Sequence, residues 1–228
     1  MPSPTRLFRG KLTYAHKDDG EFGREWFTVS IQPDGTRTMR CLCEMDHVSL
    51  TRDVTYTVDK DFLPIDCFVR VVNENKFVGS GWFEFHDNWA TAEVNTAAEG
   101  RVSQRIETPA RPRLFGTHPI SIDIWKCIHV QAARVGESQV VKNCFSSSLV
   151  TNGASGPLLI PKTYAMTYRG KDRIDVPAGT FDCEHFDWDT GTGRTLNLFT
   201  QPGDWLPIRT EVPEGGRFYE LVEFETVH

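Results

Sequence analysis

Several side chains that can move protons or hold an anion lie close together around one predicted helix, residues 119–133. His118 precedes Pro119, and Lys126 and His129 follow within the helix. The positive end of a helix dipole disfavours an imidazolium, so a neutral His118 could act as general base or general acid near neutral pH. Free amide hydrogens at the same helix start could hold a carboxylate or a developing oxyanion. The sequence therefore predicts acid–base chemistry at this helix.

This chemistry needs a cavity between the helix and the structure around it. Lys126, Arg70 and a tyrosine could hold a carboxylate or phenolate there and stabilise negative charge. Aromatic residues make up 11% of the chain, which suits a flat, partly polar ligand. The candidate catalytic residues are His118, Lys126 and Tyr168. The candidate substrate-binding residues are Tyr14, Arg70, Trp82, Trp125, His129 and Tyr164.

Lys126 also has a plainer explanation. Asp123 lies three residues before it, a spacing that makes two side chains neighbours on a helix surface. The two could form an exposed ion pair at the mouth of a barrel, which would contribute little to stability or function. The sequence leaves both explanations open.

Residues 119–133 carry the pattern of a helix that other structure encloses. Pro119 suits the first helical position because its ring presets the φ angle, and the amide hydrogen that proline lacks would have no partner in the helix there. Thr117 or His118 could cap the helix. At about 100° per residue, apolar side chains occupy most of the circumference. They are Ile120, Ile122, Ile124, Trp125, Cys127 and Ile128. Such a helix is expected to pack against the concave face of a sheet.

The rest of the chain consists of short β-rich runs separated by turns. Residues 36–44 alternate in polarity, as a strand with one wet face does. Pro-Asp-Gly at 33–35 and Glu-Gly-Gly at 214–216 favour hairpin turns. Repeated hairpins disfavour the parallel nucleotide-binding folds. We therefore predict a mainly β fold: a single strongly curved antiparallel sheet, a half-barrel or open barrel, wrapped around one helix in one domain over residues 1–228.

Length, charge and motifs exclude several classes of protein. The formal net charge is −6 and basic residues are scattered, so we expect no nucleic-acid partner. Residues 1–7 lack a signal-peptide core and no run approaches the ~20 apolar residues of a membrane span, so we expect a cytoplasmic protein without a membrane partner. The six cysteines form no framework and should be reduced and buried. No phosphate loop, dinucleotide fingerprint or metal-ligand spacing occurs, and we expect neither cofactor nor metal.

A signature near the end of the chain resembles a family of bacterial domains of unknown function. Val-Pro-Ala-Gly-Thr-Phe occupies residues 176–181. Residues 204–211 and 219–221 also follow the pattern of this family, in which a strand that ends in Pro-hydrophobic-Arg precedes a final strand. The match covers the last third of the chain well and 25–72 loosely. The resemblance implies a half-barrel similar to periplasmic lipoprotein carriers and to lipocalin-like enzymes. A similar half-barrel is used by a cofactor-free enzyme of violacein pigment biosynthesis, and lipocalin-like barrels also serve phenolic acid decarboxylases and cyclases. These likenesses concern the fold.

Two functions are compatible with these observations. The first is a cofactor-independent acid–base enzyme, a lyase, isomerase or cyclase, that acts on a small aromatic or hydrophobic substrate in the barrel cavity, with His118 as general base or acid. The alternative is a non-catalytic protein that binds or carries a hydrophobic ligand, which needs the same cavity but no histidine. Replacing His118 by Ala would separate the two. A homodimer is compatible with either function.

Overall fold

Fifteen strands form one sheet in the computed structural model, which describes residues 5–130, 134–150, 152–190 and 194–227. Neighbouring strands run antiparallel, and among those described only the β9–β10 pair is parallel. The first eight strands are β1 (Arg6–His16), β2 (Gly20–Ile31), β3 (Arg37–Met45), β4 (Leu50–Val58), β5 (Pro64–Asn73), β6 (Lys76–Phe85), β7 (Trp89–Thr96) and β8 (Gly100–Glu107). The others are β9 (Leu114–Gly116), β10 (Ser138–Ser146), β11 (Ile160–Val176), β12 (Gly179–Asp189), β13 (Thr195–Gln201), β14 (Leu206–Val212) and β15 (Arg217–Val227).

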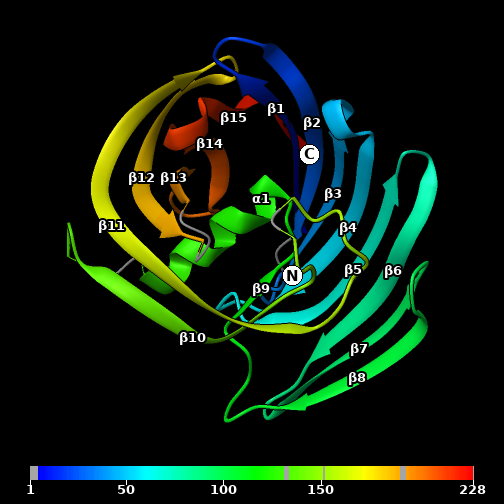
Figure 1. The fold of residues 1–228 in the computed structure, drawn as a ribbon. Helices are drawn as coiled ribbons and strands as arrows, with labels where there is room; N and C mark the ends of the chain where they lie inside the picture. Colours follow the sequence, from blue (N-terminus) through cyan, green and yellow to red (C-terminus); the bar gives the residue numbers. More distant parts are fainter. Residues whose placement is uncertain (1–4, 131–133, 151, 191–193, 228) are drawn as a thin grey trace.

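The sheet extends in two directions from the ends of the chain. β1 pairs with β15, from Leu7 opposite Val227 to His16 opposite Arg217. From β1 the strands follow one another to β8, and from β15 they follow one another back to β9. β8 and β9 are the two end strands, so the sheet is not closed. Figure 1 shows the sheet bending around α1, with β6 to β8 extending away from it. The predicted mainly β, strongly curved open sheet is confirmed.

The helix is shorter than predicted and mostly of the tighter 3₁₀ type. α1 (Ile120–Asp123) continues directly into the 3₁₀ helix η2 (Ile124–Val130), and residues 131–133 of the predicted helix lie outside the described residues. Both helix types bring residues three apart close to one side, so the apolar pattern in the sequence does not distinguish them. Two further 3₁₀ turns connect strands, η1 (Asp46–Val48) and η3 (Pro213–Gly215).

Strand β4 illustrates how the sequence selects the two faces of the sheet. Its sequence, Leu-Thr-Arg-Asp-Val-Thr-Tyr-Thr-Val, alternates strictly between buried and half-buried side chains. Leu50, Val54, Tyr56 and Val58 lie on the concave, buried face, and Arg52 shares that face with them. Successive side chains of a strand point to opposite faces, so a polar residue in register with apolar ones is carried inside.

Local irregularities help the long strands to curve. The pairing register shifts between Tyr14 and Ala15 in β1 and between Val71 and Val72 in β5. Such bulges place an extra residue on one strand and increase its bend and twist. The Val-Pro-Ala-Gly-Thr-Phe signature forms the hairpin between β11 and β12, where Val176 pairs with Gly179.

One side of the helix rests on a dry aromatic core. Trp125 is 3% exposed and packs edge-on against Phe62, with ring centroids 5.6 Å apart. Phe115, in β9, packs against Phe83 and Phe85 at 4.8 and 4.9 Å. All six cysteines are buried free thiols, as the sequence predicted. Trp125 thus packs η2 against β4 and the turn that follows it, and the other side of the helix lies beside a cavity.

Candidate ligand-binding cavity

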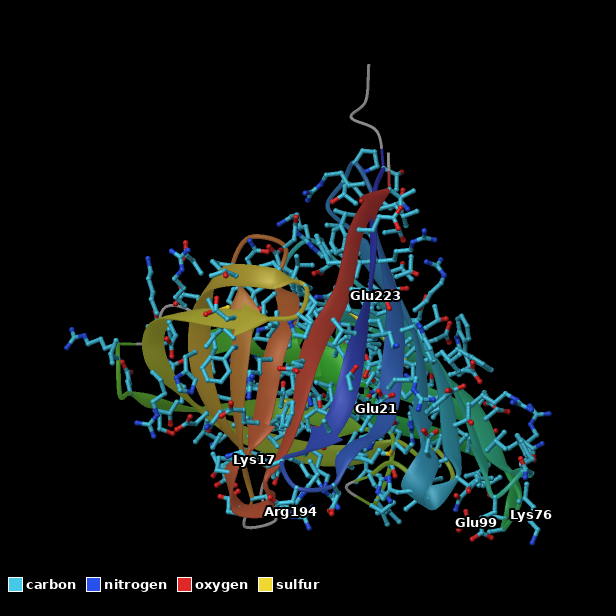
Figure 2. The ribbon with its side chains drawn as sticks, turned by 90° about the horizontal axis from the view of Figure 1, so that it is seen from above. Lys17, Glu21, Lys76, Glu99, Arg194 and Glu223 are labelled. Atoms are coloured by element: carbon cyan, nitrogen blue, oxygen red, sulfur yellow. The ribbon has the colours of Figure 1, made fainter. Side chains whose placement is uncertain are left out.

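A cavity of about 1170 Å³ lies between α1 and the concave face of the sheet. Its walls come from β1 to β4 on one side and from β10 to β15 on the other. Asp19, Arg194 and Glu214, which lie in connections between strands, also line it. Figure 2 shows Lys17 and Arg194 together at one end of the sheet, where the hairpin turns gather. The turns at this end form the rim of the cavity.

The lining combines an apolar wall with charged groups. Apolar and aromatic side chains come from six strands and one 3₁₀ turn, namely Phe22, Met45, Val48, Leu50, Trp188, Leu196 and Val212. Buried charged groups lie among them, chiefly Arg52, Asp123 and Lys126. A concave site of this size with a few buried polar groups has the form of a small-molecule binding site.

Arg52 is a buried cation on the cavity wall, 2% exposed. Its Nη1 donates to the Thr117 carbonyl oxygen at 3.2 Å, and its Nη2 donates to the carbonyl oxygen of Gly153. Its Nε has no hydrogen-bond partner among the described residues. Burial lowers the pKa of the guanidinium to about 10. Arg52 therefore stays protonated at neutral pH.

Lys126 forms the ion pair with Asp123 that its plainer explanation predicts, but the expected exposure is wrong. The two side chains are 3% and 7% exposed, and Nζ donates to the Asp123 carboxylate. Nζ also lies 3.7 Å from the ring centroid of Trp188 and 5.0 Å from that of Tyr164, distances at which an aromatic face attracts a cation. Burial raises the pKa of Asp123, and the charge of Lys126 opposes that shift. The pair is buried because this side of the helix faces the cavity inside the curved sheet rather than solvent.

Glu25, which the sequence analysis missed, fixes the start of the helix. It is fully buried in β2 and accepts hydrogen bonds from the amides of Ile120 and Ser121 at 2.9 and 3.1 Å, and from the hydroxyls of Ser121 and Tyr14. Burial raises the pKa of Glu25, and these four donors oppose the rise. The expectation that the helix start offers free amides to a ligand is therefore wrong, because a carboxylate of the chain itself uses them.

The residue before the helix has an unusual backbone. His118 lines the cavity with a φ of 78°, in the left-handed region that non-glycine residues seldom adopt. Pro119 takes the N-cap position, so the prediction that Thr117 or His118 caps the helix is wrong. Residues held in such conformations are over-determined by their surroundings and often occur at functional sites.

Four of the nine candidate site residues line this cavity, and the other five do not. The four are Tyr14, His118, Lys126 and Tyr164. Arg70 is exposed beside the buried Val69 and Val71, and Trp82 is 45% exposed, so both lie on the convex face of the sheet. Their assignment to the cavity is wrong because strand alternation turns them outward.

The remaining three lie inside the fold but away from the cavity lining. Trp125 belongs to the aromatic core. His129 is near Asp59 and Arg113, and burial lowers its pKa to about 4. Tyr168 donates to the carboxylate of Glu184, and burial together with that bond raises the pKa of its phenol to about 12. Their placement in the cavity is therefore corrected.

Strand alternation would have found the two charged residues that the sequence analysis missed. Arg52 has the same parity as Leu50 and Val54, and Glu25 the same parity as Phe27 and Val29. A charged side chain at such a position is carried to the buried face. Trp188 gives a similar signal, because it has the same parity as the buried Phe186 and is flanked by Asp187 and Asp189.

Comparisons with known proteins identify a fold. No family model matches the chain and no curated protein matches it. A β-barrel-like protein of domain of unknown function DUF1849 from Brucella abortus is similar in structure, with 12% identity, 98% of each chain covered and a TM-score of 0.54. A DUF1089 family protein from Pseudomonas aeruginosa is 10% identical over 80% of this chain and 86% of its own, with a TM-score of 0.42. The chain thus shares a β-barrel-like fold with the Brucella protein.

None of the helices in the described part of the chain is long and apolar enough to cross a membrane. Within the same residues, histidine, cysteine, aspartate and glutamate side chains form no group of three that could hold a metal ion.

Proposed function

We propose that this protein binds a small hydrophobic or aromatic molecule in the cavity between α1 and the concave face of the sheet. The observation that carries the proposal is the lining: an apolar and aromatic wall around a cavity of about 1170 Å³, with buried charged groups on one side. Burial of an apolar ligand against such a wall is favourable, at about 25 cal/mol per Å² of surface removed from water. The half-barrel form and the likeness to carriers that the Val-Pro-Ala-Gly-Thr-Phe signature implies agree with it.

Filling the cavity tests this proposal. Leu196 lines the cavity from β13, whereas its neighbour Asn197 does not. We expect Leu196→Trp to weaken binding of the neutral dye Nile red by roughly tenfold or more, about 1.4 kcal/mol, in a fluorescence titration. The matched variant Asn197→Trp should bind the dye as the unmodified protein does. Equal affinities in the two variants, or no binding by the unmodified protein, would refute the proposal.

Acid–base catalysis in the same cavity is a second candidate, favoured by one observation. His118, Tyr164 and the Asp123–Lys126 pair all line the cavity that would hold the substrate. A histidine could exchange a proton with a bound ligand, and the lysine could stabilise negative charge that develops on it.

Proton exchange measured by NMR distinguishes the two candidates. Aromatic acids and phenols would be incubated with the protein in D₂O and screened for deuterium incorporation at carbon. The catalytic candidate predicts that His118→Ala lowers the incorporation rate by about 10²-fold or more while leaving Nile red affinity unchanged. Incorporation that persists at the same rate in the variant, or that is absent with every compound, would leave ligand binding as the function.

A further inference from the structure

Arg52 differs from the other buried charges of the cavity in how its charge is compensated. Lys126 pairs with Asp123, and Glu25 accepts four hydrogen bonds. Arg52 meets two carbonyl oxygens and forms no ion pair with any carboxylate in the described residues. A guanidinium has five N–H donors, and a buried charge without a counter-charge is costly. The uncompensated charge of Arg52 therefore calls for an anion.

The charge of the whole lining points the same way. The chain carries a formal net charge of −6, yet the cavity is lined by more cationic than acidic side chains. The cations are Arg52, Lys126, Lys162, Arg194 and Arg217, and they face three acidic residues. The cationic excess of this lining favours ligands of negative charge.

We propose that the ligand is a hydrophobic carboxylate whose carboxylate group binds at Arg52 and whose apolar part lies along the wall formed by Leu50, Trp188 and Leu196. This inference rests on the proposed function and adds the chemical class of the ligand. The planar guanidinium matches the two oxygens of a carboxylate, and the resulting hydrogen bonds are charge-assisted. Arg52 would then determine specificity, because an uncharged ligand of the same shape leaves its charge uncompensated.

A purely structural role for Arg52 is the competing explanation. Its two carbonyl partners belong to the segment before α1 and to the loop after β10, so the side chain joins these segments. Such a role predicts lower stability on substitution but no preference between charged and uncharged ligands. The two explanations therefore differ in an observable that does not depend on stability.

The role of Arg52 is tested with a matched pair of fluorescent probes. The probes are 11-(dansylamino)undecanoic acid and its primary amide, which have nearly the same shape and differ in charge. We expect the unmodified protein to bind the acid roughly tenfold or more tightly than the amide. Arg52→Gln should lower the affinity for the acid to that for the amide, and Arg52→Lys should keep part of the preference. Arg70→Gln, on the convex face, should change neither affinity.

The outcomes separate this inference from the proposed function. Equal binding of acid and amide by the unmodified protein would refute the role of Arg52 and leave ligand binding intact. A preference that survives Arg52→Gln but disappears in Lys126→Met would assign the anion to Lys126 and refute it as well. Failure of both probes and of Nile red to bind would refute the proposed function itself. Since the first comparison uses the unmodified protein, the test remains decisive even if Arg52→Gln does not fold.

Discussion

Single residues in this protein show how burial changes the behaviour of a charged group. Glu25 is satisfied by four donors, two of them helix amides, and Lys126 by a carboxylate and two aromatic rings. At His129, by contrast, burial disfavours the charged form of the imidazole. Burial is therefore compensated by partners at Glu25 and Lys126, and it lowers the pKa at His129.

The lowered pKa of His129 predicts a pH dependence of stability. The pKa falls from 6.5 to about 4 on folding, so the unfolded chain binds a proton first as the pH drops. The contribution of His129 is thus complete above pH 6.5 and is lost progressively down to about pH 4. Between about pH 7 and pH 5 we expect a loss of about 2 kcal/mol in the free energy of unfolding.

Urea denaturation at the two pH values measures this loss. His129→Gln should be less sensitive to the change in pH, whereas His47→Gln, at an exposed histidine, should behave as the unmodified protein does. If His129→Gln and the unmodified protein lose the same stability, burial of His129 does not control the dependence. Substitution of His129 should leave the affinity for Nile red unchanged, because His129 does not line the cavity.

The candidate site was only partly predictable at the residue scale. His118 and Lys126 were found because the helix pattern placed them on one element. The sequence analysis assigns Arg70 to the site and omits Arg52, although the alternation of β4 and β5 distinguishes the buried Arg52 from the exposed Arg70. The hydrogen bond that Glu25 accepts from the amide of Ile120 joins residues 95 positions apart. No local pattern in the sequence reveals such a partner.

Among the elements, the loop between β10 and β11 lines part of the cavity. Its Ser147 amide donates to the Gly116 carbonyl oxygen at 2.8 Å, and its Gly153 accepts from Arg52. Gly153 has a φ of +72°, and a Cβ there would lie 2.5 Å from Nη2 of Arg52. Glycine is needed at this position both for its backbone conformation and because the guanidinium packs against it.

A substitution at this glycine tests the link between the loop and the site. Gly153→Ala should displace the guanidinium of Arg52 and lower the affinity for 11-(dansylamino)undecanoic acid severalfold. Gly100→Ala is a matched control, because Gly100 has a φ of +73° and open space where its Cβ would lie. Each substitution should cost about 1–2 kcal/mol of stability from backbone strain. An unchanged affinity for the acid in Gly153→Ala would show that the loop does not position Arg52.

The elements themselves were predictable to different degrees. Alternation predicts strands such as β3 and β4, because a sheet with one buried face repeats every two residues. The apolar circumference of 120–128 predicts an enclosed helix, but its 3₁₀ geometry depends on packing inside the sheet and on the anchor at Glu25. Local propensity contains neither of these tertiary contacts.

At the scale of the whole molecule, the pairing of β1 with β15 makes one curved surface from the two ends of the chain. This pairing brings the cavity-lining Tyr14 and Tyr219 opposite each other, with ring centroids 4.8 Å apart. The sequence predicts hairpins but not the pairing of strands that are distant along the chain. The open sheet leaves room between its halves for the helix and for the cavity beside it (Figure 1).

The central claim, that this cavity holds a ligand, is tested most directly by a crystal structure of the protein grown with 11-(dansylamino)undecanoic acid. Our account predicts electron density for the probe between α1 and the concave face, with its carboxylate beside Arg52. Density confined to the convex face, or a cavity closed by the protein's own side chains while the probe remains in solution, would contradict it.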